Sequence, residues 1–166
     1  MINIRDAKIE DIDRINEIYN HAIHEKFKVA YLTPWTKEAR LEWYKEHNHK
    51  EYPIYVAEIA HVVIGFVFIQ PYRQGRIALK QSAEISYFID NQYRKMGVGK
   101  KLIEYMESKC SMIGIKTLLA IIIDNNEASI HLIEKCGYKK WGHLPEIANF
   151  DDIEVGHLYY GKRIVS

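Results

Sequence analysis

Apolar residues recur every three or four positions in several segments of the chain, and this spacing predicts amphipathic helices. The first predicted helix precedes Thr36. A second follows Thr36, which suits an N-cap, with Glu38 in the first turn of that helix. A third runs from Gly97 to Gly114, and a short fourth covers Glu127–Lys135. The first helix has its apolar face at Ile12, Ile15, Tyr19, Ala22 and Ile23, and the third at Leu102, Ile103, Met106, Cys110 and Ile113.

Between these helices, alternating or continuous apolar runs predict strands. We expect Ala60-His61 to join two of them in a hairpin, Tyr72–Lys80 to form a loop, and another loop around Pro145 to separate the last two strands. The element order predicts a mixed α/β fold in a single domain over residues 1–166. The predicted strands are Ile2–Ile4, Ile54–Ile59, Val62–Gln70, Ala83–Ile89, Thr117–Ile123, Tyr138–Leu144 and His157–Val165.

Composition narrows the functional classes. The formal net charge is +1, which gives no reason to expect nucleic acid or a membrane as a partner. Met1–Asp6 is polar and does not resemble a signal peptide, so we expect a cytoplasmic protein. Cys110 and Cys136 fall in helical patterns and are expected to be buried free thiols.

The segment Arg94-Lys95-Met96-Gly97-Val98-Gly99 lies between a predicted strand and a predicted helix. Glycines allow a close backbone approach there, and the free N–H groups at a helix start attract anions. The expected ligand is a phosphate or pyrophosphate. A nucleotide P-loop needs a hydroxyl residue after its lysine, whereas Lys101 follows Lys100, and a dinucleotide fingerprint needs glycine where Leu102 stands.

This segment fits the pattern Arg/Gln-x-x-Gly-x-Gly/Ala and resembles the CoA loop of the Gcn5-related N-acetyltransferase (GNAT) superfamily. The opening Ile4-Arg5-Asp6-Ala7, the run Asn126-Glu127-Ala128-Ser129 and the later Glu134-Lys135-Cys136-Gly137-Tyr138 are similar to further family segments. Gly142-His143-Leu144-Pro145-Glu146 resembles the phosphinothricin acetyltransferase branch.

The resemblance implies a twisted mixed sheet in which two central parallel strands, Ala83–Ile89 and Thr117–Ile123, splay apart between flanking helices. It also implies acetyl-CoA as co-substrate, without a metal. The backbone of Tyr87, Phe88 and Ile89 would bind the pantetheine arm, and the Arg94–Gly99 loop the pyrophosphate. Asn126 matches a cofactor-binding amide, although its residue type equally suits a helix cap.

The reaction needs a base, because only a neutral amine attacks a thioester. Backbone N–H groups can stabilise the resulting oxyanion. Glu84 matches the glutamate of the phosphinothricin branch and is the candidate base; the alternative is a charged residue on a solvent face. Many members of the family carry a tyrosine or histidine that acts as the general acid, and the matching position here holds Ile133. Tyr138 is expected to pack in the core.

The positions expected to contact the amine acceptor match the family less well than the cofactor segments do. Tyr19 and Asn20 on the first helix and Arg73 in the loop are the candidate substrate residues, with His21 and His24 beside them. Changed branch positions at Leu79, Lys80 and Asn149–Ile153 put phosphinothricin in doubt, and the acidic residues near 151 would suit a cationic acceptor. His47 and His49 could ligate a metal, but a polar helix end is favoured.

We therefore expect an acetyl-CoA-dependent N-acetyltransferase that acts on a small primary amine, such as an amino acid or an analogue like phosphinothricin or methionine sulfone. The alternatives are a protein or peptide N-terminal acetyltransferase and a non-catalytic CoA-binding sensor. The family analogy also suggests a homodimer.

Overall fold

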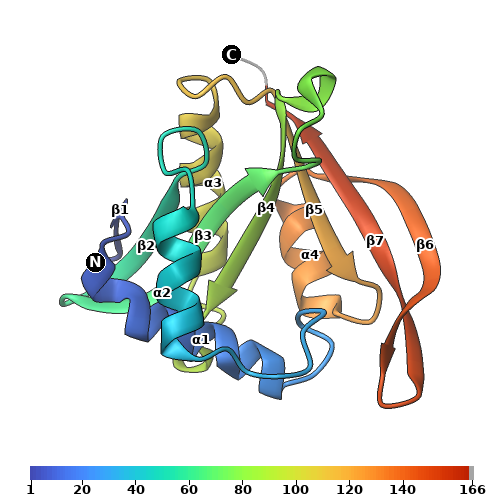
Figure 1. Ribbon diagram of the computed structural model, residues 1–166, viewed down its shortest axis with the longest axis horizontal. Helices are drawn as coiled ribbons and strands as arrows, with labels where there is room; N and C mark the ends of the chain where they lie inside the picture. The colour runs from blue at the N-terminus through green and yellow to red at the C-terminus, as the bar shows by residue number, and fades with distance from the viewer. Residues whose placement is uncertain (165–166) are drawn as a thin grey trace.

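The computed structural model describes residues 1–164, which form a seven-stranded mixed sheet with helices on both faces (Figure 1). This confirms the predicted mixed α/β fold. The strands are β1 (Asn3–Asp6), β2 (Ile54–Ile59), β3 (Val62–Pro71), β4 (Ser82–Ile89), β5 (Thr117–Ile123), β6 (Lys139–Phe150) and β7 (Ile153–Arg163). The helices are α1 (Ile12–His24), α2 (Lys37–Glu46), α3 (Val98–Cys110) and α4 (Glu127–Lys135), with short 3-10 turns η1 (Ile9–Asp11), η2 (Ile77–Leu79) and η3 (Asn91–Tyr93).

The centre of the sheet is split. The strand order is β1-β2-β3-β4-β5-β7-β6, and β4 and β5 run parallel. They pair only at Ser82↔Thr117, Ala83↔Leu118 and Glu84↔Leu119. Figure 1 shows the two strands close together at this end and spread apart toward their carboxyl ends. The predicted splay is therefore confirmed, and Glu84 marks the last pair before it.

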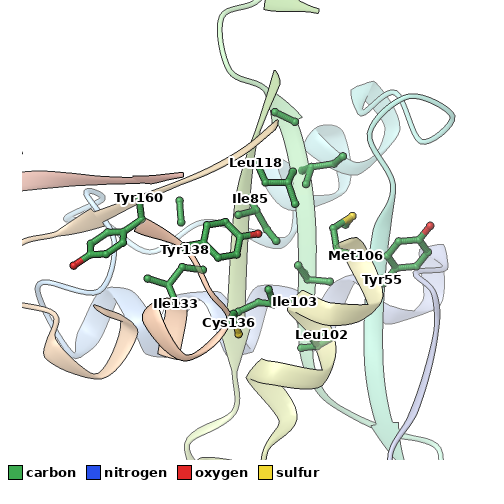
Figure 2. Close-up of a cluster of buried hydrophobic side chains, with 14 of the residues drawn as sticks. Tyr55, Ile85, Leu102, Ile103, Met106, Leu118, Ile133, Cys136, Tyr138 and Tyr160 are labelled. Carbon is green, nitrogen blue, oxygen red and sulfur yellow. The ribbon is translucent and has the colours of Figure 1, made fainter. Parts of the chain in front are cut away.

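Two hydrophobic layers hold the sheet. Helices α3 and α4 pack on one face, where Leu102, Ile103 and Met106 have no exposed surface (Figure 2). Helices α1 and α2 pack on the other face against Phe66, Phe68 and neighbouring strand residues. Burying each large apolar side chain contributes on the order of 1.5–3 kcal/mol, so these layers fix the strand positions on both sides of the split.

Local signals in the sequence placed several boundaries correctly. The hydroxyl oxygen of Thr36 accepts a hydrogen bond from the Ala39 N–H at 3.1 Å and so caps α2. Ala60 and His61 both have positive φ, at 49° and 66°, and join β2 to β3 in a two-residue turn. That conformation matches the twist of a hairpin.

The predicted loop around Pro145 was wrong. Strand β6 continues through Pro145 to Phe150, and the chain reverses at Asp151 and Asp152, which both have positive φ. The register shifts between Leu144 and Ala148. Strand β6 is the edge of the sheet, where a proline without an N–H is tolerated at such an irregularity. Strand β7 ends at Arg163, and Val165, where the last predicted strand ended, lies outside the described residues.

Helix α3 ends earlier than predicted, at Cys110. Residues 111–114 form turns, so Ile113 is only partly buried and does not belong to the helix stripe. The Ile115 N–H donates to the Cys110 carbonyl at 2.9 Å, with Gly114 at φ 76°. A left-handed residue closed by a backbone bond to the last turn ends helices in this way. Within residues 1–164, no helix combines the length and apolar character of a membrane span.

Candidate active site

Glu84 lies at the point where β4 and β5 separate, with its side chain on the α1/α2 face of the sheet. The amide of Gln70, its partner on β3, donates a hydrogen bond to a Glu84 carboxylate oxygen at 3.1 Å. Burial raises the pKa of Glu84 above its ordinary value, while the Gln70 bond and the charge of His157 pull the pKa back. A partly desolvated carboxylate with a raised pKa is suited to accept a proton near neutral pH. His157, on β7, did not stand out in the sequence.

Beyond Glu84, one edge of β4 has no strand beside it. Tyr87, Phe88 and Ile89 pair with β3 on the other edge, and the pairing with β5 has already ended. Their side chains alternate between the faces: the Tyr87 hydroxyl lies 2.6 Å from the Ser129 hydroxyl on α4, and the Phe88 ring packs against Tyr19. The backbone of this segment is therefore available for main-chain hydrogen bonds to an extended ligand.

The loop Arg94–Gly99 turns tightly into α3. Gly97 has φ 79° and is the N-cap, and it is exposed together with Lys95 and Met96. Lys95 also adopts a positive φ of 63°. Val98 and Gly99 are buried in the first turn of the helix. This places the free N–H groups of the α3 N-terminus at the open end of the split, as an anion such as pyrophosphate requires.

The Arg94 side chain reaches from the loop to the end of α1. Its two terminal nitrogens bind the Glu25 carboxylate at 2.9 and 2.8 Å, so the guanidinium links the loop to the end of α1. This bidentate arrangement is a strong form of the ion pair between an arginine and a carboxylate. The loop thus carries this guanidinium beside its backbone N–H groups and lysine side chains.

Asn126 is buried and caps α4: its side-chain oxygen accepts from the Ser129 N–H at 3.4 Å and from the Lys28 ammonium at 3.2 Å. The helix-cap interpretation is therefore confirmed, and the residue lies at the carboxyl end of β5 beside the split. Ile133, about two turns further along α4, points into the core beside Tyr138 and Cys136 (Figure 2). It offers no group that could donate a proton.

Tyr19 and Asn20 occupy the α1 side of the site. Burial raises the pKa of Tyr19 to about 12, and the negative charges of Tyr31 and Glu84 add to that increase. The Asn20 side-chain NH₂ donates to the Trp35 carbonyl, and its oxygen accepts from the Trp35 N–H, at 2.9 Å each. These two bonds hold the α1–α2 connection in place. Asn20 therefore has a structural role that the sequence did not reveal.

Arg40 was missed entirely, because a charged residue gives no signal of burial. It is 1% exposed on α2, and its guanidinium lies 4.2 Å from the ring centroid of Tyr19 and 4.1 Å from that of Trp35. Trp43 encloses it from a third side. Burial lowers the pKa of Arg40 to about 10. Tyr31 packs edge-on against both Tyr19 and Trp35, and we refer to these three rings as the aromatic wall.

A cavity of about 480 Å³ lies between the end of α2 and the β3–β4 loop. Gln70 lines it and connects it to Glu84 through their hydrogen bond. Arg73 lines it too and rests on the Tyr72 ring, with 5.5 Å between guanidinium and centroid. This volume lies in the range of small-molecule sites.

The histidines considered for metal binding have structural partners. His47 lies 2.6 Å from the Tyr52 carbonyl and His49 lies 2.8 Å from the Tyr44 carbonyl. In the part of the chain that the structure describes, no three His, Cys, Asp or Glu residues gather as metal ligands would.

The split in the sheet and the glycine turn beside it suit a ligand that has an extended arm and a phosphate group. The family model described as "Acetyltransferase (GNAT) family" matches residues 17–138. The chain therefore belongs to the GNAT acetyltransferase family.

Among its relatives, YwnH of Bacillus subtilis (strain 168), a phosphinothricin acetyltransferase candidate by name, is 34% identical over 151 residues, covering 90% of this chain and 91% of YwnH. The L-methionine sulfoximine/L-methionine sulfone acetyltransferase of Pseudomonas paraeruginosa is 27% identical, covering 87% of this chain and 84% of the enzyme. The structure of a GNAT superfamily phosphinothricin acetyltransferase from Sinorhizobium meliloti in complex with acetyl-CoA has the same fold, with a TM-score of 0.92, 22% identity and coverage of 98% and 88%. The likeness to YwnH confirms the phosphinothricin acetyltransferase-like branch.

Proposed function

We propose that this protein transfers the acetyl group of acetyl-CoA to the primary amine of a small acceptor, an amino acid or an analogue such as phosphinothricin or methionine sulfone. The observation that carries the proposal is the position of Glu84 at the last β4–β5 pair, next to the unpaired edge of β4. Relatives named for phosphinothricin and methionine sulfone acetylation support this acceptor class.

The residues of the split fit acetyl-CoA. The unpaired backbone of Tyr87–Ile89 suits the amides of a pantetheine arm, and the Gly97 turn suits a pyrophosphate. Asn126, with its oxygen already occupied, can present its NH₂ group as a donor. When bound, acetyl-CoA supplies an activated acetyl carbonyl.

Glu84 accepts the proton that the amine must lose, directly or through one water molecule. Its carboxylate lies on the α1/α2 face, so we propose that the acceptor approaches there, between the aromatic wall and the cavity beside Gln70. N–H groups on the free edge of β4 are suited to stabilise the negative charge that develops on the acetyl oxygen. Because Ile133 has no proton to give, we propose that the thiolate leaves without a protein acid.

The direct test is release of free thiol from acetyl-CoA over a panel of amino acids, phosphinothricin, methionine sulfone, polyamines and peptides. We expect rapid release with a small amino acid or analogue. Preference for peptides would support an N-terminal acetyltransferase, and acetyl-CoA binding without thiol release would support a non-catalytic sensor. Either result would contradict the proposal.

We further propose a cytoplasmic homodimer. Both cysteines are buried and unpaired, which suits a reducing compartment.

The β6–β7 hairpin exposes three large apolar residues, Trp141, Ile147 and Ile153, each about half exposed in the single chain. Exposed apolar groups of this kind favour a protein interface. Sedimentation equilibrium should give twice the mass of one chain, and Trp141→Glu should reduce the mass to that of a single chain.

A further inference from the structure

The four residues 25–28, which we call the strap, connect α1 to the rest of the site. At one end, the Glu25 carboxylate holds the Arg94 guanidinium through two bonds of 2.9 and 2.8 Å. At the other end, the Lys28 ammonium donates to the Asn126 side-chain oxygen at 3.2 Å. Each end of the strap therefore binds a residue that belongs to a proposed acetyl-CoA contact, Arg94 at one end and Asn126 at the other.

The middle of the strap is anchored to the β6–β7 hairpin. The Lys26 ammonium lies 2.7 Å from the Asp151 carboxylate, and the Phe27 ring packs on Phe150 with centroids 5.0 Å apart. Lys26 and Phe27 both adopt positive φ, at 48° and 56°. Side chains other than glycine enter this region at a cost, so the packing of Phe27 on the buried Phe150 must hold the strap in place. The Lys26–Asp151 pair is largely exposed and adds little to this.

Only two residues separate the strap from the aromatic wall. Tyr31 packs edge-on against Tyr19, with centroids 6.1 Å apart, and against Trp35, with centroids 5.3 Å apart. The backbone of Trp35 is fixed by the Asn20 amide. The segment between Lys28 and Trp35 is thus held at both ends but has few partners in between, and Tyr31 is about half exposed.

We propose that the strap couples acetyl-CoA binding to the ordering of the aromatic wall. The inference rests on the proposed function. A cofactor seated on the Arg94 loop and on Asn126 restricts both residues that hold the ends of the strap. Glu25 and Lys28 transmit this restriction to residues 29–33, so the acceptor wall becomes ordered after the donor has bound. Glu25 and Lys28 are positioning residues in this account. Coupling of this kind typically changes an equilibrium by about 5- to 150-fold.

The test is hydrogen exchange of the backbone N–H groups of residues 29–33 in the full chain, with and without saturating acetyl-CoA. In the wild type, acetyl-CoA should slow exchange there by at least about fivefold. Glu25→Gln and Lys28→Met should still bind acetyl-CoA in calorimetry but lose most of this slowing. Lys26→Met is the matched control, because it removes a lysine ion pair of the same strap that reaches only the hairpin, and it should behave like the wild type.

The outcomes separate this inference from the proposed function. If the wild type releases thiol but exchange at 29–33 is the same with and without acetyl-CoA, the coupling is refuted and the catalytic proposal stands. The coupling is also refuted if Lys28→Met and Lys26→Met respond alike. A wild type that does not bind acetyl-CoA at all refutes both.

Discussion

Glu84 shows how one residue obtains its chemistry from its position in the sheet. Strand β4 pairs with β5 as far as Glu84 and from Ile85 on pairs with β3 alone, so a carboxylate and a free backbone edge lie side by side. The carboxylate is half-buried, and its pKa is raised by burial and lowered by the Gln70 bond and the His157 charge. Burial is the largest of these effects, so the pKa stays above its ordinary value.

The pH dependence of turnover follows from this balance. A base works in its deprotonated form, so kcat should rise with pH through the pKa of Glu84, at a higher pH than for an ordinary glutamate, whose pKa is about 4.3. Gln70→Leu removes a bond that favours the charged form and should move this rise to still higher pH. The measurement is kcat against pH for both proteins; a rise at lower pH in Gln70→Leu would contradict the assignment.

Gly97 offers a test of the cofactor loop that avoids side-chain clashes. A Cβ at Gly97 would meet nothing within 4 Å, but its φ of 79° disfavours any other residue by about 1–2 kcal/mol. If the bound loop needs this conformation, Gly97→Ala should weaken acetyl-CoA binding by about tenfold in calorimetry.

The matched control is Gly75→Ala, since Gly75 has φ 75°, equally open surroundings and a place in the β3–β4 loop. It should share the backbone strain but leave acetyl-CoA affinity unchanged. Equal losses of affinity in the two variants would mean that the Gly97 turn does not contact the cofactor.

At the scale of elements, the β6–β7 hairpin is the part that the sequence described least well. The alternation of apolar and polar residues stops near Pro145, because both strands lie at or near the sheet edge and the register shifts there. The tip nevertheless has its own small core, in which Phe150 and Val155 pack with Ile123. That core and the strap hold the hairpin against the rest of the molecule.

Phe150→Ala should therefore destabilise the fold by about 3 kcal/mol, measured as the free energy of unfolding in urea. Phe150 is 2% exposed and its ring supports Phe27 of the strap. Lys140→Ala, at an exposed position of the same strand, should change stability by less than about 0.5 kcal/mol. A loss below about 1 kcal/mol for Phe150→Ala would show that the hairpin tip is not a cooperative part of the fold.

For the whole molecule, helices and central strands followed from periodicity, because their apolar faces are buried against a sheet. The glycine turn and the position of Glu84 could be predicted from the resemblance. Three polar features could not be predicted, since polar residues look alike in sequence whether they are exposed or buried. These are the buried Arg40, the Glu25–Arg94 ion pair and the two hydrogen bonds between Asn20 and Trp35. Only the folded chain brings these partners together.

The central claim is that Glu84, at the point where the sheet divides, is the base of an acetyl-CoA-dependent N-acetylation. The most direct measurement is thiol release by Glu84→Gln and wild type with the same amine, alongside calorimetry with acetyl-CoA. We expect kcat to fall by about 10²- to 10⁴-fold while acetyl-CoA affinity stays within about threefold. Unchanged turnover in Glu84→Gln would contradict the account.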